Sequence, residues 1–208
     1  MPDRRKSVLK VIRLFPKNIT KKTIVVLGAP RGGTSMLSGT LHELGVFMGE
    51  NIGHQKEDPR FHSRTSIEEK RRAVAENNAV YDVWGWKLPN TIYYFDELRE
   101  ELINPVFLSI YRNPMEIAMS SAHRDSTELT DHLLRVPIDH YRKMHSMLAK
   151  HGDIPWAACS FDEVARNKAR RPKIRLIRDL ISLLDLKPTQ DQIDAALKFI
   201  DYDKGYQS

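Results

Sequence analysis

The residues best suited to chemistry stand in a short glycine-rich segment. Residues 28–35 read GAPRGGTS and follow the β-branched run 23–27, and an apolar helical pattern begins directly after them. A buried strand, a glycine-rich turn and a helix N-terminus form an anion site, because backbone N–H groups and the positive helix end face the ligand. The segment nearly fits the phosphate loop G-x-x-x-x-G-K-[ST]. It therefore predicts a site for a phosphate-like anion.

The departure from that pattern is Thr34, which stands where kinases and ATPases have a lysine. In those enzymes the lysine contacts the β- and γ-phosphates, and magnesium is held by the next hydroxyl. Here the cation is Arg31, inside the loop. The segment thus favours an anion site without Mg–ATP chemistry. A plain strand-to-helix connection is the structural alternative.

A second candidate anion site follows the apolar run 105–111. Arg112 comes directly after this run, and Ser120 lies in the helix that Pro114 is placed to begin. An arginine offers a bidentate fork to a phosphate dianion. Taken singly, the structural alternative is favoured: Arg112 caps a sheet edge, and Ser120 is a buried helix serine. Together with the glycine-rich loop, the pair predicts a ligand with two anionic groups.

The two segments together resemble the sulfotransferases that use 3′-phosphoadenosine-5′-phosphosulfate (PAPS). Residues 30–35 match the family's loop P-[KR]-[SG]-G-[TS]-[ST], which grips the 5′-phosphosulfate, and the arginine resembles the bacterial and glycan-modifying branches. The family also has an arginine after a core strand, followed in the next helix by a serine, for the 3′-phosphate. The resemblance implies PAPS as donor and adenosine 3′,5′-bisphosphate (PAP) as product. It implies that the donor is held by Arg31, Gly32, Gly33, Thr34, Ser35, Arg112 and Ser120.

The same resemblance suggests the groups that act on the transferred sulfuryl group. Residues 84–89 resemble the segment where the family places a lysine before a proline, so we expect Lys87 and Arg31 to stabilise the developing negative charge. A base for the acceptor is expected among Glu57, Asp58 and His54. Glu57 comes first, since residues 57–60 resemble an acidic-proline segment of bacterial members. A solvated turn with Asp58 capping a helix is the alternative. No metal is expected.

Composition narrows the classes of partner. The chain has 208 residues, a formal charge of +6 and a pI near 9.4, which favours anionic ligands. Cys159 is the single cysteine, so neither a disulfide framework nor a zinc cluster is expected, and a cytoplasmic location suits it. Nucleic acid is not an expected partner, because no recognisable binding module is present. No stretch reaches the roughly 20 apolar residues of a membrane span.

The expected elements alternate between strands and helices. Strands are predicted at 23–27, 84–89, 105–111 and 156–161, and helices at 34–44, 66–78, 96–103, 114–121, 138–150, 174–186 and 191–200. This order predicts an α/β fold, a three-layer sandwich with a mostly parallel central sheet of the P-loop nucleotide-binding type. We expect one domain over 23–208 after a basic extension, 1–22. The run 7–15 fits an amphipathic helix at an anionic membrane or, more simply, a segment packed on the domain.

The sequence therefore predicts a sulfotransferase that moves a sulfuryl group to a hydroxyl or amine of a carbohydrate, lipid or small molecule. Residues 46–80 and 122–137 are expected to form the acceptor wall. A nucleotide kinase or other P-loop phosphotransferase is the enzyme alternative, and a degenerate nucleotide-binding domain without transfer activity is the other. The family's late glycine-rich loop over the cofactor has at best a remnant at 204–205, and the basic run 170–173 is a further candidate for holding an anion.

Overall fold

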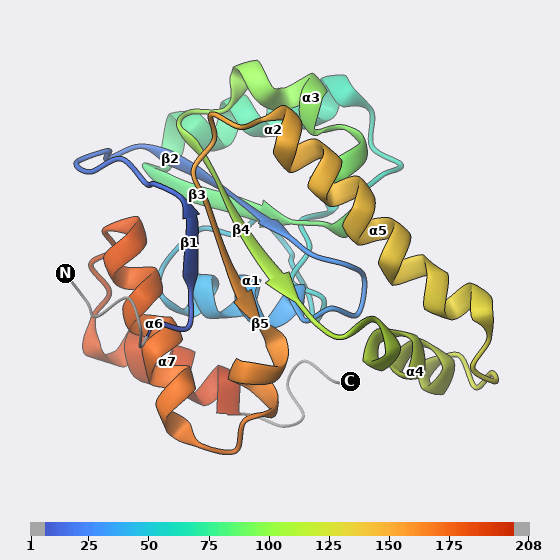
Figure 1. Cartoon of the computed structure of the whole chain (residues 1–208). Coiled ribbons are helices and arrows are strands. Elements are labelled where there is room, and N and C mark those ends of the chain that lie inside the picture. Colours follow the sequence, from blue (N-terminus) through green and yellow to red (C-terminus); the bar gives the residue numbers. More distant parts are fainter. Residues whose placement is uncertain (1–6, 202–208) are drawn as a thin grey trace.

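The computed structural model describes residues 7–201, which form a five-stranded sheet with helices on both faces (Figure 1). The sheet order is β1-β5-β4-β2-β3. Four strands are parallel, and β1 alone runs antiparallel, beside β5. The strands are β1 (Lys10–Arg13), β2 (Lys22–Leu27), β3 (Val83–Lys87), β4 (Pro105–Tyr111) and β5 (Trp156–Ser160).

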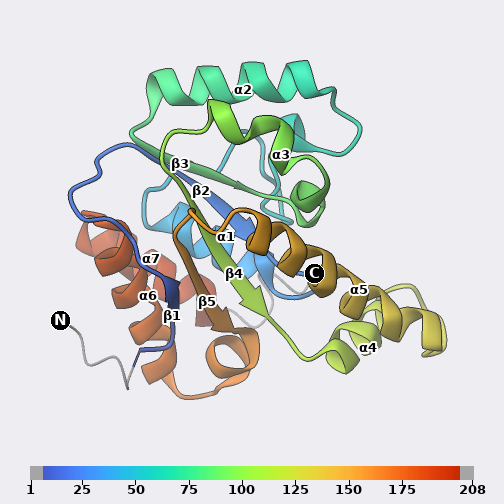
Figure 2. The same ribbon diagram turned by 45° about the horizontal axis from the view of Figure 1, so that its top comes forward.

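Seven α-helices connect and cover these strands in the described part of the chain. They are α1 (Thr34–Glu43), α2 (Ile67–Val80), α3 (Phe95–Leu98), α4 (Pro114–Arg124), α5 (Asp131–Lys150), α6 (Arg170–Leu184) and α7 (Gln190–Asp201). Figures 1 and 2 show α1, α6 and α7 on one side of the sheet and α2, α3 and α5 on the other. The predicted three-layer α/β fold with a mostly parallel sheet is confirmed.

Alternation along the strands divides the core between the two faces. Ile24 and Val26 of β2 join the cluster with α1, α6 and α7, whereas Val25 and Leu27 join the cluster with α2, α3 and α5. All six residues of β2 are buried, as expected for a parallel strand covered on both faces. The central strands β2 and β4 are thus held firmly by the core on both faces. The candidate anion-binding segments begin where these two strands end.

Several elements differ from the sequence-based expectation, among them α5 and α3. Helix α5 begins at Asp131, not Ile138, because Thr130 caps its first turn by accepting from the N–H of Leu133 at 3.3 Å, and Pro137 lies inside the helix. The predicted helix 96–103 is instead the short α3 followed by a 3-10 turn at Arg99–Glu101. The possible remnant of a late loop at 204–205 lies outside the described residues.

The N-terminal segment is part of the sheet. Residues 10–13 form β1 against β5, not the amphipathic helix considered from the sequence. Val8 and Leu9 are buried in the α1-side core, and the carboxylate of Asp179 on α6 accepts from Ser7 Oγ at 2.8 Å and from their two N–H groups at 2.9 and 3.0 Å. The segment therefore packs on the domain.

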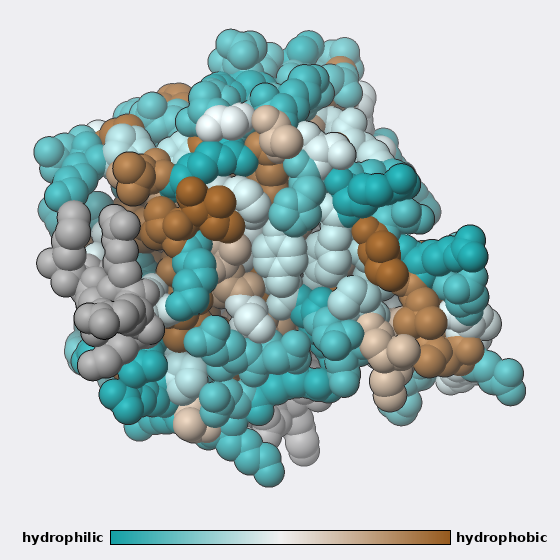
Figure 3. Space-filling view, in the orientation of Figure 1, coloured by the Kyte–Doolittle hydropathy of each residue, from teal (hydrophilic) through white to brown (hydrophobic). Residues whose placement is uncertain are grey.

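Helices α4 and α5 project from the sheet as a lobe (Figure 1). Figure 3 shows hydrophobic surface over this lobe within a largely hydrophilic face. The exposed large hydrophobic side chains of these two helices and the segment joining them are Met115, Met119, Leu129, Val136 and Ile138. None of the helices between residues 7 and 201 combines the length and apolar character needed to cross a membrane.

Candidate anion-binding site

A cavity of about 1200 Å³ lies at the carboxyl ends of the parallel strands, where α/β sheets commonly bind ligands. Its wall includes the glycine-rich loop after β2, Lys87 at the end of β3, Arg112 after β4 and Phe161 after β5. Eight of its lining residues are arginine or lysine and two are aspartate or glutamate. The cationic members are Arg31, Lys87, Arg112, Arg124, Arg166, Lys168, Arg170 and Lys173. This surplus of positive charge suits a polyanionic ligand.

The glycine-rich loop has a backbone that only small residues allow. Gly33 has φ +94°, and a Cβ on it would come within 2.2 Å of the Phe161 ring. A Cβ on Gly32 would lie 2.7 Å from the carbonyl oxygen of Ala29, which accepts the Gly32 N–H at 2.8 Å. Gly33 precedes α1 without a side-chain cap among the described residues. The first turn of α1 therefore presents backbone donors toward the cavity.

The two predicted anion-binding segments meet in this cavity. Arg31 donates to Ser120 Oγ through Nε at 3.3 Å and through NH2 at 3.0 Å. Arg112 donates through NH1 to the carbonyl oxygen of Arg31 at 3.0 Å. Gly33, Thr34 and Ser35 line the same cavity. The structure thus brings together the loop after β2 and the strand end and helix after β4.

The positive charges of Arg31 and Arg112 are disfavoured by burial and by neighbouring arginines. Burial lowers the pKa of Arg31, and the charge of Arg124 lowers it further. Burial also lowers the pKa of Arg112, with further lowering by the charges of Arg166 and Arg31. The Arg112 Nε is buried and has no hydrogen-bond partner among the described residues. An anion that accepts from these guanidinium groups would relieve both conditions.

Lys87 and Glu57 form an ion pair in the wall of the cavity. Lys87 Nζ lies 2.7 Å from Glu57 Oε1, and the lysine side chain is only 3% exposed. Burial lowers the pKa of Lys87, and the nearby Glu57 carboxylate partly offsets that effect. A cation and a carboxylate in contact at one position offer a charge stabiliser and a proton acceptor side by side.

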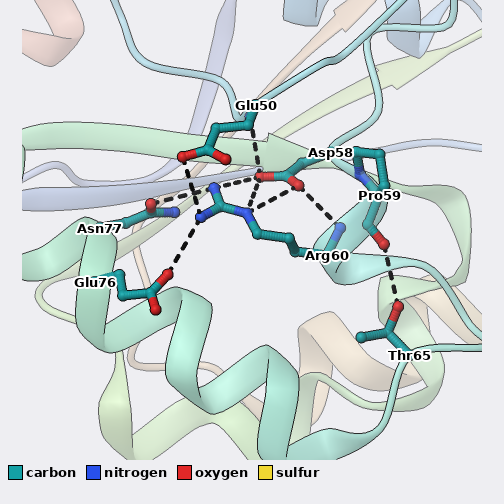
Figure 4. A network of polar contacts seen from close by, with 7 residues as sticks. All are labelled: Glu50, Asp58, Pro59, Arg60, Thr65, Glu76 and Asn77. Atoms are coloured by element: carbon teal, nitrogen blue, oxygen red, sulfur yellow. Dashed lines mark hydrogen bonds and ion pairs between the residues drawn. The ribbon is translucent and has the colours of Figure 1, made fainter.

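The other two candidate bases occupy different environments. His54 lines the cavity with Glu57. Asp58 does not line it, because its side chain is fully buried and pairs with Arg60 (Figure 4). It accepts from Arg60 NH2 at 2.7 Å and from the Arg60 backbone N–H at 2.9 Å. Asp58 thus caps the turn Pro59–Phe61, the alternative considered from the sequence, and is not placed to act as a base.

Hydroxyl groups of α1 bind the loop that follows this helix. Ser35 Oγ donates to the carbonyl oxygen of Gln55 at 2.8 Å, and Ser38 Oγ donates to that of Lys56 at 3.2 Å. Thr34, by contrast, is buried at the start of α1. These contacts tie the loop that contains His54 and Glu57 to α1. They position the candidate base relative to the glycine-rich loop.

Several cavity residues were not singled out in the sequence. Arg124 and His123 come from the end of α4, and Arg166 and Lys168 from the segment after β5. Of the basic run 170–173, Arg170 and Lys173 line the cavity. The general rule that ligands bind at the carboxyl ends of parallel strands points to the segments after β4 and β5, but it marks no individual residue in them.

The fold is similar to that of solved sulfotransferases. The sulfotransferase domain from the curacin biosynthetic pathway matches with a TM-score of 0.52 and 11% identity, covering 84% of this chain and 77% of that one. The corresponding domain from the Synechococcus PCC 7002 olefin synthase gives 0.51 and 13%, covering 93% and 84%. Mouse sulfotransferase SULT7A1, complexed with PAP, gives 0.50 and 11%, covering 86% and 64%.

Kinases also match. A gluconokinase from Sinorhizobium meliloti 1021 has 17% identity and covers 81% of this chain and 98% of that one. Its TM-score of 0.46 is too low to support an argument. No family model matches the chain, and no curated protein matches it. At these identities the likeness shows the fold alone. It is a P-loop-like α/β fold of the kind that sulfotransferases have.

Proposed function

We propose that this protein is a sulfotransferase that uses PAPS as donor and releases PAP. The observation that supports it most is the contact of Arg31 with Ser120, together with that of Arg112 with the Arg31 carbonyl. These contacts join the candidate site for a 5′-phosphosulfate to the candidate site for a 3′-phosphate. The fold similarity to sulfotransferases, one of them complexed with PAP, supports the same assignment.

The residues of the cavity fit such a donor. Gly33, Thr34 and Ser35 line the cavity where α1 begins, so the backbone N–H groups of its first turn would face a phosphate oxygen of the donor. The buried, unpartnered Nε of Arg112 is a donor that an anionic oxygen would satisfy. Arg31, Gly32, Gly33, Thr34 and Ser35 would hold the 5′ end, and Arg112 and Ser120 the 3′-phosphate.

When bound, PAPS supplies an activated sulfuryl group and a leaving phosphate. In this proposal, Glu57 takes the proton of the acceptor hydroxyl at Oε1 or Oε2, and His54 is the alternative base on the same wall. Lys87, released from Glu57 as that carboxylate becomes neutral, stabilises the charge that develops on the leaving side, and Arg31 does so from the loop. The proposed acceptor is a hydroxyl or amine of a carbohydrate, a lipid or a small molecule.

A nucleotide kinase is the second candidate only because of the shared fold type. Thr34 occupies the position of the phosphate-loop lysine, and the cation Arg31 contacts Ser120. A kinase would need magnesium and a triphosphate in this loop. The proposal therefore predicts binding of PAP and not of Mg–ATP.

Isothermal titration with PAP, and separately with ATP plus magnesium, tests the assignment. We expect PAP to bind and Arg112→Ala to weaken it about 10- to 100-fold, the range for losing charge-assisted hydrogen bonds. Arg72→Gln, an exposed arginine on α2, is the control for the loss of one charge. Transfer of labelled sulfate from PAPS to a panel of neutral sugars and alcohols then tests turnover. Binding of Mg–ATP alone would reverse the assignment.

A further inference from the structure

A carboxylate links two arginines at the edge of the cavity. Glu116, on the first turn of α4, has Oε2 at 2.5 Å from Arg166 NH2 and at 3.8 Å from Arg112 NH2. Arg112 follows β4, and Arg166 ends the π-helical turn Asp162–Arg166 that follows β5. π-Helical turns are frequent at functional sites. The segments after β4 and β5 thus place two guanidinium groups close together, and Glu116 of α4 contacts both of them.

The carboxylate that joins the two arginines is not part of the cavity wall. Arg112 and Arg166 line the cavity, whereas Glu116 is not among the described residues that line it. Glu116 therefore does not occupy the space that a ligand would use. The charge of Glu116 offsets the repulsion between the two guanidinium groups. It also holds the Arg166 side chain, which is 48% exposed and whose other carboxylate neighbour, Asp162, lies at 3.6 Å.

Arg112 is already fixed by other contacts. Its NH1 donates to the carbonyl oxygen of Arg31, and its guanidinium carbon lies 4.9 Å from the centre of the Phe161 ring. The hydroxyl of Tyr141 accepts its backbone N–H at 2.9 Å. An arginine can bind a phosphate dianion through two parallel N–H groups, but Arg112 already uses NH1 on the carbonyl oxygen of Arg31. Arg166, which shares the Glu116 carboxylate with Arg112, offers a further guanidinium group at this place.

We propose that Arg166, positioned by Glu116, is the second cation for the 3′-phosphate of the nucleotide and sets selectivity for a 3′-phosphorylated ligand over one without that group. The inference rests on the proposed function for the identity of the ligand. Arg166 is the binding residue, and Glu116 is a positioning residue that acts through it. The turn after β5 thereby supplies a charge to the nucleotide that the motif segments after β2 and β4 do not contain.

The ratio of affinities for PAP and adenosine 5′-monophosphate (AMP), measured by isothermal titration, tests the proposal. The two ligands share the 5′ end and differ in the 3′-phosphate. We expect Arg166→Gln to reduce the preference for PAP about tenfold or more, by weakening PAP and leaving AMP unchanged. Glu116→Gln is expected to reduce it in the same direction. Arg171→Gln on α6 and Glu128→Gln, both exposed and outside the cavity wall, are the charge-matched controls.

The double variant Arg166→Gln/Glu116→Gln separates positioning from a general structural role. If Glu116 acts through Arg166, its substitution adds nothing further to the loss of selectivity when Arg166 is already absent. Thermal melts without ligand show whether each variant folds. Unchanged selectivity in Arg166→Gln, or additive losses in the double variant, would overturn the inference while PAP binding by the wild type stands. Failure of the wild type to bind PAP would overturn the proposed function and this inference together.

Discussion

Asp58 and Glu57 are adjacent carboxylates with opposite surroundings, and Asp58→Asn separates their roles. The Asp58 side chain is completely buried and accepts from Arg60 through Nε at 3.1 Å and through NH2 at 2.7 Å. It also accepts from the backbone N–H of Glu50 at 3.3 Å (Figure 4). An asparagine keeps one acceptor oxygen and turns an N–H₂ group toward the guanidinium donors. The perturbation therefore breaks a buried ion pair while conserving volume.

Breaking a buried pair by removing one partner costs about 3–5 kcal/mol. The lower end applies here, because the Arg60 side chain is 23% exposed and keeps Glu50 at 3.7 Å and Glu76 at 3.6 Å. We expect a loss of about 3 kcal/mol, which for a chain of this length lowers the melting temperature by about 6–12 °C. Asn77, whose Oδ1 accepts from Arg60 at 3.3 Å, shares the same network.

Urea denaturation followed by tryptophan fluorescence measures this loss. Phe61, next to Arg60, stacks on Trp86 with ring centroids 4.7 Å apart, so the signal reports on the affected turn. Asp82→Asn is the matched control, since its side chain is 72% exposed and 3.9 Å from Lys21, and it should change stability by less than about 0.5 kcal/mol. Equal stability of the two variants, or loss of transfer activity by Asp58→Asn without loss of stability, would refute this reasoning.

Three further variants test other parts of the structure. Burial lowers the pKa of His140 to about 4, so on acidification the unfolded chain binds a proton at this histidine before the folded chain does. The free energy of unfolding therefore falls by up to about 3 kcal/mol between pH 6.5 and 4. His140→Gln should flatten that part of the plot of unfolding free energy, measured in urea, against pH. Burial raises the pKa of Cys159 to about 12, so a thiol reagent at pH 8 should react about a thousandfold faster in urea than with the folded protein. Gly33 has φ +94°, so Gly33→Ala should lower the free energy of unfolding by about 1–2 kcal/mol and weaken PAP binding. Gly152→Ala is the control and should do neither, because the nearest atom to its new Cβ lies at 3.7 Å. Equal effects of the two variants in titration and in thermal melting would contradict this.

The sequence was most informative where local chemistry decides the structure. Strand β4 has the predicted bounds, 105–111, because a continuous apolar run buried on both faces forms there. Helix α1 begins at the predicted Thr34, because the glycines before it leave no side chain in the way. In contrast, α5 continues through Pro137, since the apolar contacts of its C-terminal half and the cap at Thr130 outweigh the one lost backbone hydrogen bond.

The candidate site was predictable only in its motif segments. Arg31, Arg112 and Ser120 follow from local patterns, and the structure brings them into contact. Arg166 reaches the cavity through the turn after β5, and no local pattern marks it, because its position depends on Glu116 of another helix. The position of Asp58 before Pro59 already indicated a helix cap. Its burial, which is a property of the folded chain, favours the cap over a catalytic base.

The antiparallel strand β1 has a consequence for any shortened form of this protein. It occupies the outer side of β5, where Lys10 pairs with Ala158 and Val11 with Ala157. A chain that starts at residue 23 would leave the backbone donors and acceptors of β5 open to another polypeptide. Such a chain would self-associate through that strand, and the N-terminal peptide added in trans would compete for the same strand edge and reduce that association.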